Sequence, residues 1–106
     1  MSAKSIWLTI GVPEDIPMGR GKPYLIEDMR VAIFHTEDGR FFAIDQNCPH
    51  LLGPLAEGLL QGTTVTCLFH NWQFDIITGQ CLNRPSHQVN RYAVKVEDGL
   101  LWLALN

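Results

Sequence analysis

The sequence contains few basic residues and none of the motifs that bind nucleotides or cleave covalent bonds. Eight Lys and Arg stand against 11 Asp and Glu among 106 residues, for a formal charge of −3. This balance leaves no basic footprint, so nucleic acid is excluded as an expected partner. The chain also lacks a glycine-rich phosphate loop, a dinucleotide fingerprint and a hydrolytic triad. It is therefore expected neither to hold NADH or FAD nor to catalyse a reaction by itself.

Long hydrophobic runs and a disulfide pattern are missing as well. The apolar run at residues 6–10 ends before Pro13, which is too short for a signal-peptide core followed by a cleavage site and far too short to cross a bilayer. Three cysteines do not imply a disulfide framework. These absences predict a soluble protein of a reducing, cytoplasmic compartment with no membrane partner.

Helical periodicity is almost absent, and short apolar segments alternate with turn residues along the chain. This pattern predicts an all-β fold, and the length suits one small domain with a modest core. The pair Asp38-Gly39 predicts a hairpin, as does the turn at residues 97–99. Strands are expected at residues 6–10, 24–26, 31–35, 41–45, 63–66, 73–76, 80–82, 92–96 and 100–104, with a loop at 18–23.

Two short segments each combine one cysteine with one histidine. The first reads Cys48-Pro49-His50, and the second, after sixteen intervening residues, reads Cys67-Leu68-Phe69-His70. A thiolate and an imidazole at fixed offsets, repeated once, have few explanations other than a metal centre. The candidate metal and cofactor ligands are therefore Cys48, His50, Cys67 and His70.

Two kinds of metal centre suit these four ligands. They could bind one tetrahedral zinc ion, or a [2Fe–2S] cluster with both cysteines on one iron and both histidines on the other, the arrangement called Rieske. The pattern C-x-H then C-x-x-H interleaves the two ligand types, so that each loop can give a Cys to one iron and a His to the other. Zinc fingers usually group like ligands. The interleaving favours the iron cluster.

The same segments resemble the two cluster-binding loops of the Rieske family. The resemblance rests on C-P-H, on C-x-F-H and on the following Trp72-x-Phe74-Asp75-x-x-Thr78-Gly79. It implies a Rieske-type (ISP domain) β-sandwich in which a cluster-binding lobe, at about residues 46–83, is inserted into a base sandwich. It also implies that residues 83–86 form a third loop against the cluster, because a proline loop recurs there in the family.

Charge counting indicates what such a cluster does. Two ferric ions, two sulfides and two thiolates sum to zero, so the cluster accepts an electron more easily than one with four thiolates, and potentials lie at roughly −150 to +300 mV. High-potential relatives add a disulfide between the loops and two hydroxyl donors to sulfur. Here Gly53 and Phe69 occupy the disulfide positions, and Trp72 and Phe74 occupy the hydroxyl positions. The sequence therefore predicts a potential near the negative end of the range.

Across essentially the whole chain the sequence resembles the small subunit of assimilatory NAD(P)H-dependent nitrite reductase. The resemblance is carried by residues 19–21, 31–34, 74–82 and 92–99. It implies an electron-transfer component of an oxidoreductase, with a large flavin and sirohaem subunit as its partner. Two other hypotheses stay open: a ferredoxin between a flavoprotein reductase and the terminal oxygenase of a ring-hydroxylating dioxygenase, and a zinc-stabilised interaction module.

Other conspicuous residues have structural explanations. His35 beside a hairpin turn and His87 in a polar loop are expected to be exposed or capped histidines rather than ligands. Cys81 is expected to be a small strand residue that faces the core. Trp7 and Trp102 are expected to pack inside the base sandwich.

Overall fold

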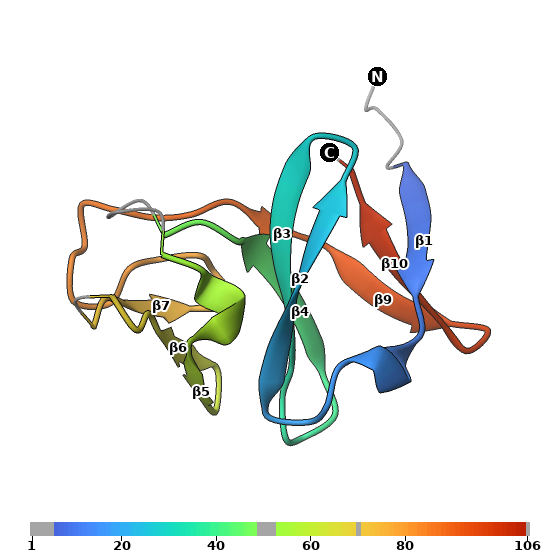
Figure 1. The fold of residues 1–106 in the computed structure, drawn as a ribbon, viewed down its shortest axis with the longest axis horizontal. Helices are drawn as coiled ribbons and strands as arrows, with labels where there is room; N and C mark the ends of the chain where they lie inside the picture. Colours follow the sequence, from blue (N-terminus) through green and yellow to red (C-terminus); the bar gives the residue numbers. More distant parts are fainter. Residues whose placement is uncertain (1–5, 49–52, 70, 106) are drawn as a thin grey trace.

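The computed structural model describes residues 6–48, 53–69 and 71–105, and within these ranges the regular secondary structure consists of strands and two short 3-10 turns (Figure 1). The expected all-β fold is confirmed. The strands are β1 (Trp7–Gly11), β2 (Arg20–Ile26), β3 (Met29–His35), β4 (Phe41–Asp45), β5 (Leu59–Gln61), β6 (Thr64–Thr66), β7 (Gln73–Asp75), β8 (Arg91–Tyr92), β9 (Val94–Glu97) and β10 (Leu100–Ala104), and two 3-10 turns are η1 (Pro13–Asp15) and η2 (Leu55–Glu57). No helix in the described part of the chain is long and apolar enough to cross a membrane.

Three antiparallel sheets stack across the molecule. Their strand orders are β1-β10-β9, β2-β3-β4-β8 and β5-β6-β7. The middle sheet lies between the other two, with the three short strands β5 to β7 at one end of the molecule and β1, β9 and β10 at the other (Figure 1). The third sheet falls wholly within residues 46–83.

The central residues of strand β3, 31–34, are all apolar because both faces of the strand are buried there. Val31 and Ile33 belong to one buried cluster, and the alternating residues Ala32 and Phe34 belong to another. Successive side chains of a strand point to opposite faces, so a strand between two cores reads as a continuous apolar run rather than an alternating one. All four residues have no exposed surface.

The two clusters are named here for their positions. The base core, between the sheets β1-β10-β9 and β2-β3-β4-β8, consists of Ile16, Ile26, Val31, Ile33, Ala43, Leu101 and Leu103. The site core, between the middle sheet and β5-β6-β7, consists of Ala32, Phe34, Ile44, Cys48, Leu55, Ala56, Val65, Cys67, Trp72, Phe74, Ile76, Cys81 and Val89. All three cysteines of the protein lie in the site core.

The expected loop at residues 18–23 is wrong from residue 20 onward. β2 begins at Arg20, and its residues from Arg20 to Ile26 pair with β3 along their whole length. Pro23 is tolerated because β2 is the edge strand of its sheet. A Cβ on Gly21 would lie 2.6 Å from the Phe34 ring, so the glycine is required by close packing rather than by a turn.

The expected strand at 80–82 is reduced to isolated bridges. Cys81 bridges Phe74, and Gln80 bridges Gln88. The expectation for the two outer tryptophans is also wrong. Trp102 alternates with the buried Leu101 and Leu103, so it lies on the outer face of its sheet, where its Nε1 donates to the Glu97 carbonyl at 3.2 Å. Trp7 is covered by the Lys95 ammonium, 4.3 Å from a ring centroid.

Candidate metal centre

Two of the four predicted ligands lie in the described part of the chain. Cys48 and Cys67 are both fully buried, and both belong to the site core. His50 and His70 lie outside the described residues. Within the described ranges no group of three or more His, Cys, Asp or Glu side chains could hold a metal ion. The two cysteines can therefore supply only part of a ligand set.

Cys48 follows β4 at the start of a closed loop. Its backbone N–H donates to the Gly53 carbonyl at 2.8 Å, and Asn47 bridges Pro54 on the next rung. The buried Gln46 side chain closes the loop further, because its Oε1 accepts from the Ala56 N–H at 3.0 Å. Gln46 was not among the residues predicted from the sequence to build the site. A polar residue at the end of an apolar strand, directly before a proposed ligand loop, was the available signal.

Cys67 follows β6 in a second closed loop, the tip of the β6–β7 hairpin. Strands β6 and β7 pair from Thr64 with Asp75 to Thr66 with Gln73. Beyond the last pair, the Cys67 N–H donates to the Trp72 carbonyl at 2.7 Å. The loop turns back through Asn71 with a φ of 59°. Asn adopts this left-handed conformation more readily than most residues.

The two loops lie against one another. A Cβ placed on Gly53 would be 2.6 Å from the Cys67 Sγ and 3.2 Å from the Phe69 ring. Glycine is therefore needed at position 53 so that the backbone of the first loop can seat the thiol of the second. Gly53 and Phe69, expected to hold the positions of an inter-loop disulfide, do face each other. The three cysteines, all of them described, form no disulfide with one another.

The donor set fits a [2Fe–2S] cluster. Two buried thiols from adjacent loops, in an apolar surrounding that includes Trp72 and Phe74, are soft anionic ligands held away from water. In the sequence, each cysteine is followed two or three residues later by a histidine, at positions 50 and 70. Paired cysteines with paired histidines are the ligands of Rieske centres.

Comparison with known proteins decides between the two metal centres. The model of the Rieske [2Fe–2S] domain family matches residues 6–95. This chain belongs to the Rieske [2Fe–2S] domain family. Its cofactor is accordingly a Rieske-type [2Fe–2S] cluster, which carries one electron at a time.

Individual relatives of this Rieske protein differ greatly in size. The chloroplastic protein TIC 55 of Arabidopsis thaliana is 31% identical over 92% of this chain, but the chain spans only 19% of that relative's length. The ferredoxin component of the naphthalene 1,2-dioxygenase system of Pseudomonas aeruginosa is 30% identical over 86% of this chain and 88% of its own. Among solved structures, one named as an NADH-dependent nitrite reductase small subunit from Mycobacterium tuberculosis superposes with a TM-score of 0.91 at 23% identity, covering 98% of both chains.

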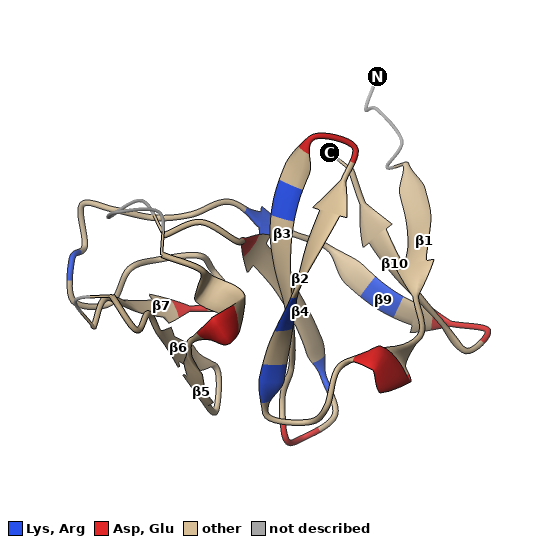
Figure 2. Ribbon diagram, viewed as in Figure 1, with Lys and Arg blue, Asp and Glu red and all other residues tan. Residues whose placement is uncertain are grey.

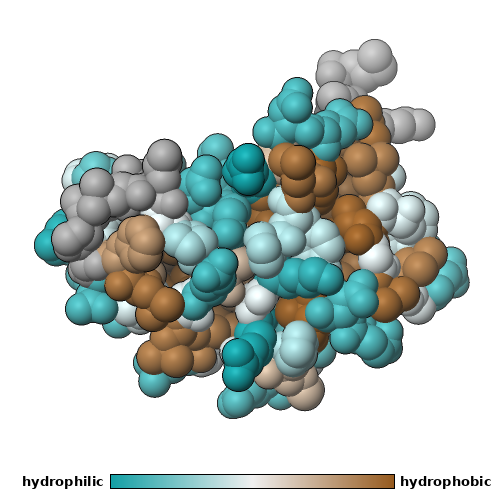
Figure 3. All heavy atoms as spheres, in the orientation of Figure 1, coloured by the Kyte–Doolittle hydropathy of each residue, from teal (hydrophilic) through white to brown (hydrophobic). Residues whose placement is uncertain are grey.

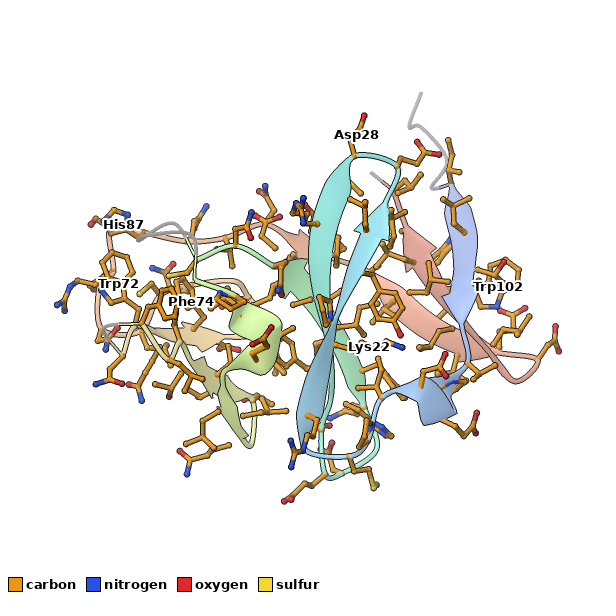
Figure 4. All side chains as sticks on the ribbon, in the orientation of Figure 1. Lys22, Asp28, Trp72, Phe74, His87 and Trp102 are labelled. Carbon is orange, nitrogen blue, oxygen red and sulfur yellow. The ribbon has the colours of Figure 1, made fainter. Side chains whose placement is uncertain are left out.

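A third segment of the Rieske domain, residues 83–87, packs against Trp72 in the loop that carries Cys67. The Trp72 ring meets the His87 ring at a centroid distance of 4.9 Å, and the Arg84 guanidinium lies 5.6 Å from the Trp72 ring centroid. Figure 4 shows Trp72 and His87 together at the end of the molecule opposite Trp102. His87 is therefore an exposed histidine that contacts an aromatic ring. His35 is capped instead, since its Nδ1 lies 2.8 Å from the Ile16 carbonyl. Cys81 is a buried core residue, as expected.

The surface of the site half carries little charge. Residues 46–83 contain no Lys or Arg and only two acidic residues, Glu57 and Asp75. Figure 2 shows this end of the ribbon largely uncoloured, and Figure 3 shows hydrophobic surface over the same end. The large apolar side chains exposed there are Leu59, Leu68, Phe69 and Leu82, at 55%, 64%, 46% and 48%.

Where the middle sheet ends, a tyrosine and a carboxylate tie β4 to β8. The Tyr92 hydroxyl donates to Asp45 Oδ1 at 2.6 Å, and Asp45 Oδ2 accepts from the Asn90 N–H at 2.8 Å. Burial, and then the neighbouring Asp45 carboxylate, raise the pKa of Tyr92 to about 12. Asp45 lies three residues before Cys48. This contact anchors the stem of the first ligand loop.

Proposed function

We propose that this protein is a one-electron carrier whose cluster is held by Cys48 and Cys67 on one iron and by His50 and His70 on the other. The observation that carries the proposal is the seat of the Cys67 Sγ against Gly53, which brings the two cysteine loops together inside the site core. Residues 46–83 would then act as the cluster-binding lobe. When bound, the cluster supplies reversible one-electron chemistry without an open coordination position for substrate.

The surroundings of the cysteines support a potential near the negative end of the Rieske range. Trp72 and Phe74 are buried in the site core and carry no hydroxyl that could donate to a sulfur. Gly53 and Phe69 cannot form a disulfide. Fewer hydrogen bonds to sulfur leave the added negative charge of the reduced state less stabilised, which lowers the potential.

The partner that we propose is the large flavin and sirohaem subunit of an assimilatory NAD(P)H-dependent nitrite reductase. The resemblance of residues 74–82 and 92–99 to small subunits of that enzyme supports it. So does the end-to-end likeness to the Mycobacterium tuberculosis protein, although at 23% identity that likeness by itself establishes only the fold. In this role the chain would pass electrons within a complex that reduces nitrite to ammonium.

A second role, as the free ferredoxin of a ring-hydroxylating dioxygenase, is favoured by a different observation. The Pseudomonas aeruginosa ferredoxin component is similar in sequence over most of its own length. In this role the protein would move between a flavoprotein reductase and a terminal oxygenase. The exposed, uncharged surface at Leu68 and Phe69, directly before His70, suits brief contact with a partner in either role.

A redox titration followed by EPR tests the proposed ligands and the potential together. Anaerobically purified protein should show a rhombic signal with an average g below the free-electron value, and the signal should appear only at low potential. A colourless protein that contains zinc would overturn the electron-transfer proposal. A Rieske signal that appears at high potential would overturn the account of the sulfur surroundings.

The two partner roles are separated by reconstitution. In the first role the protein copurifies with a large sirohaem subunit, and omitting it abolishes nitrite-dependent oxidation of NADH. In the second role it restores electron flow from a flavoprotein reductase to a ring-hydroxylating oxygenase and does not bind the sirohaem subunit. The Cys67→Ser variant serves as the control in both assays, because it should not carry electrons.

A further inference from the structure

The side chain of Asn83 lies outside both ligand loops but makes hydrogen bonds to the second one. Its Nδ2 donates to the Asn71 carbonyl at 3.0 Å, and its Oδ1 accepts from the Gln73 N–H at 3.1 Å. The two contacts therefore lie on either side of Trp72. One amide group bridges both neighbours of a single residue in the loop.

The orientation of this amide is fixed by a further donor. The Cys81 Sγ lies 3.6 Å from Asn83 Oδ1, within reach of a weak thiol hydrogen bond. Because both the Gln73 N–H and the Cys81 thiol require an acceptor, the oxygen must face them, and the NH₂ group must face the Asn71 carbonyl. Cys81 is itself fixed by its bridge to Phe74 in the site core.

The bridged residue leads directly to a proposed ligand. The Trp72 carbonyl accepts the Cys67 N–H at 2.7 Å, which is the hydrogen bond that closes the second ligand loop. The Trp72 ring contacts Arg84 and His87, which follow Asn83 in the same turn. The turn therefore holds both the backbone and the side chain of Trp72.

The backbone conformation of Asn71 explains why the loop needs the hydrogen bonds from Asn83. Its φ of 59° lies in the left-handed region, where a non-glycine residue is held at some cost. The Asn83 amide binds the carbonyl of that residue. Without it, the segment between Cys67 and β7 would keep the Cys67-to-Trp72 bond but lose the contacts that hold its turn.

From these contacts we infer that Asn83 is a positioning residue for the loop that carries Cys67 and His70, acting through Asn71, Trp72 and Gln73 to hold the backbone geometry at Cys67. This inference rests on the proposed ligand roles of Cys67 and His70. It assigns a function to the hydrogen-bonding side chain of Asn83 that is distinct from simple coverage of the cluster by the turn.

The test compares three variants. Asn83→Ala removes both halves of the bridge. Asn83→Asp keeps an acceptor for the Gln73 N–H but places a second oxygen against the Asn71 carbonyl, so it breaks one half. Gln80→Ala is the matched control, because Gln80 Nε2 donates to the Pro85 and His87 carbonyls at 2.7 and 3.4 Å and so holds the same turn without touching residues 71–73.

Three readouts follow the ligand loop directly. Hydrogen exchange of the peptide spanning residues 67–75 should accelerate in both Asn83 variants. The EPR lines should broaden and the g-values shift, because the ligand geometry becomes heterogeneous. Release of iron to a chelator from the oxidised protein should become about tenfold faster in Asn83→Ala, the effect of losing two ordinary hydrogen bonds from the closed loop. Gln80→Ala should change all three much less.

The outcomes are distinct. If Asn83→Ala lowers the melting temperature but keeps wild-type g-values, iron release and exchange, Asn83 is only structural and the inference is wrong. Equal effects from Gln80→Ala would also overturn it. If Asn83→Ala does not fold, the isosteric Asn83→Asp variant decides the question. If the wild-type protein shows no Rieske signal, the proposed ligands are wrong, whereas the exchange measurement still reports on the hydrogen bonds of Asn83.

Discussion

The two buried cores differ in how they are held. The base core is aliphatic throughout. On one side of it β2, β3 and β4 pair in unbroken register, and on the other side β1 pairs with β10 with one irregularity between Thr9 and Gly11. The site core contains three cysteines and three large aromatic residues, and its outer sheet has strands of only three residues each. There, side-chain hydrogen bonds from Gln46 and Asn83 to the backbone supplement the short strand pairing. The base supplies stability, and the site half depends on a few polar contacts and on the cluster.

Removing a proposed thiol ligand should produce the largest difference between the site half and the base half of the molecule. In Cys67→Ser we expect no cluster to be incorporated, because serine is a poor ligand for iron in this setting. The strands of the base should keep their slow amide exchange, since no base-core residue contacts the change. Iron content reports on the site half, and amide hydrogen exchange reports on the strands of the base. A Cys67→Ser protein that retained a Rieske spectrum would contradict the ligand assignment.

The complementary change weakens the base and spares the site. Leu103 is fully buried in the base core, so Leu103→Ala should lower the free energy of unfolding by about 2 to 5 kcal/mol. The EPR spectrum of the folded fraction should stay unchanged. Urea unfolding at low temperature measures the free energy of unfolding. A changed g-tensor in the folded variant would show that the two cores are coupled more closely than their separate residues indicate.

A smaller effect should follow from filling the space between the ligand loops. Gly53→Ala places a Cβ 2.6 Å from the Cys67 Sγ, and we expect a loss of about 1 to 3 kcal/mol together with reduced cluster content. Gly62→Ala is the control. Its φ of 61° is strained for alanine, but a Cβ there meets nothing within 4 Å. That variant should lose stability without losing iron. Equal iron content in both variants would mean that the loops can move apart.

The smallest effect concerns the hydrogen bond between Tyr92 and Asp45. The pKa of Tyr92 is raised from 10.0 to about 12 by burial and by Asp45, so the folded state favours the neutral phenol. The stabilisation of the folded state by the neutral Tyr92 phenol is fully present below pH 10 and is lost as the pH rises through 12. Tyr92→Phe should therefore cost about 1 kcal/mol at pH 8, and the difference from wild type should shrink above pH 10.

A second tyrosine provides the control for that measurement. The Tyr24 hydroxyl is buried, and among the described residues it has no hydrogen-bond partner. Tyr24→Phe should therefore cost little at pH 8. Urea unfolding of the wild type and both variants at pH 8 and pH 11 checks the comparison. A difference between Tyr92→Phe and the wild type that stayed constant with pH would show that the Asp45 hydrogen bond is not the source.

The sequence was informative where local rules act alone. Hairpins with Asp-Gly turns and the apolar strands of the middle sheet were predictable from their patterns, and the positions of Gly53 and Phe69 followed from the family resemblance. The ligand loops were recognisable because soft ligands at fixed spacing are rare by chance. Their four-residue assignment remains a prediction, since His50 and His70 lie outside the described residues.

What the sequence could not show depends on tertiary contacts. Arg20 to Pro23 read as a loop because Gly and Pro discourage strands, but pairing with β3 along an edge overrides that preference. Trp102 read as a core residue because of its size, whereas its register beside Leu101 and Leu103 places it outside. The hydrogen-bond partners of Gln46 and Asn83 could not be read from the sequence, even though the position of Gln46 was a signal, because each side chain binds a backbone segment ten or more residues away.

Strand β3 has a practical consequence for protein engineering. Val31 and Ile33 serve one core while Ala32 and Phe34 serve the other, so alternate positions of one seven-residue segment address separate properties. Redesign of the first pair can raise thermal tolerance without disturbing the redox centre, and redesign of the second can retune the centre on an unaltered scaffold. Adding or deleting one residue in this strand would turn the side chains of each pair toward the other core and disrupt the packing of both cores.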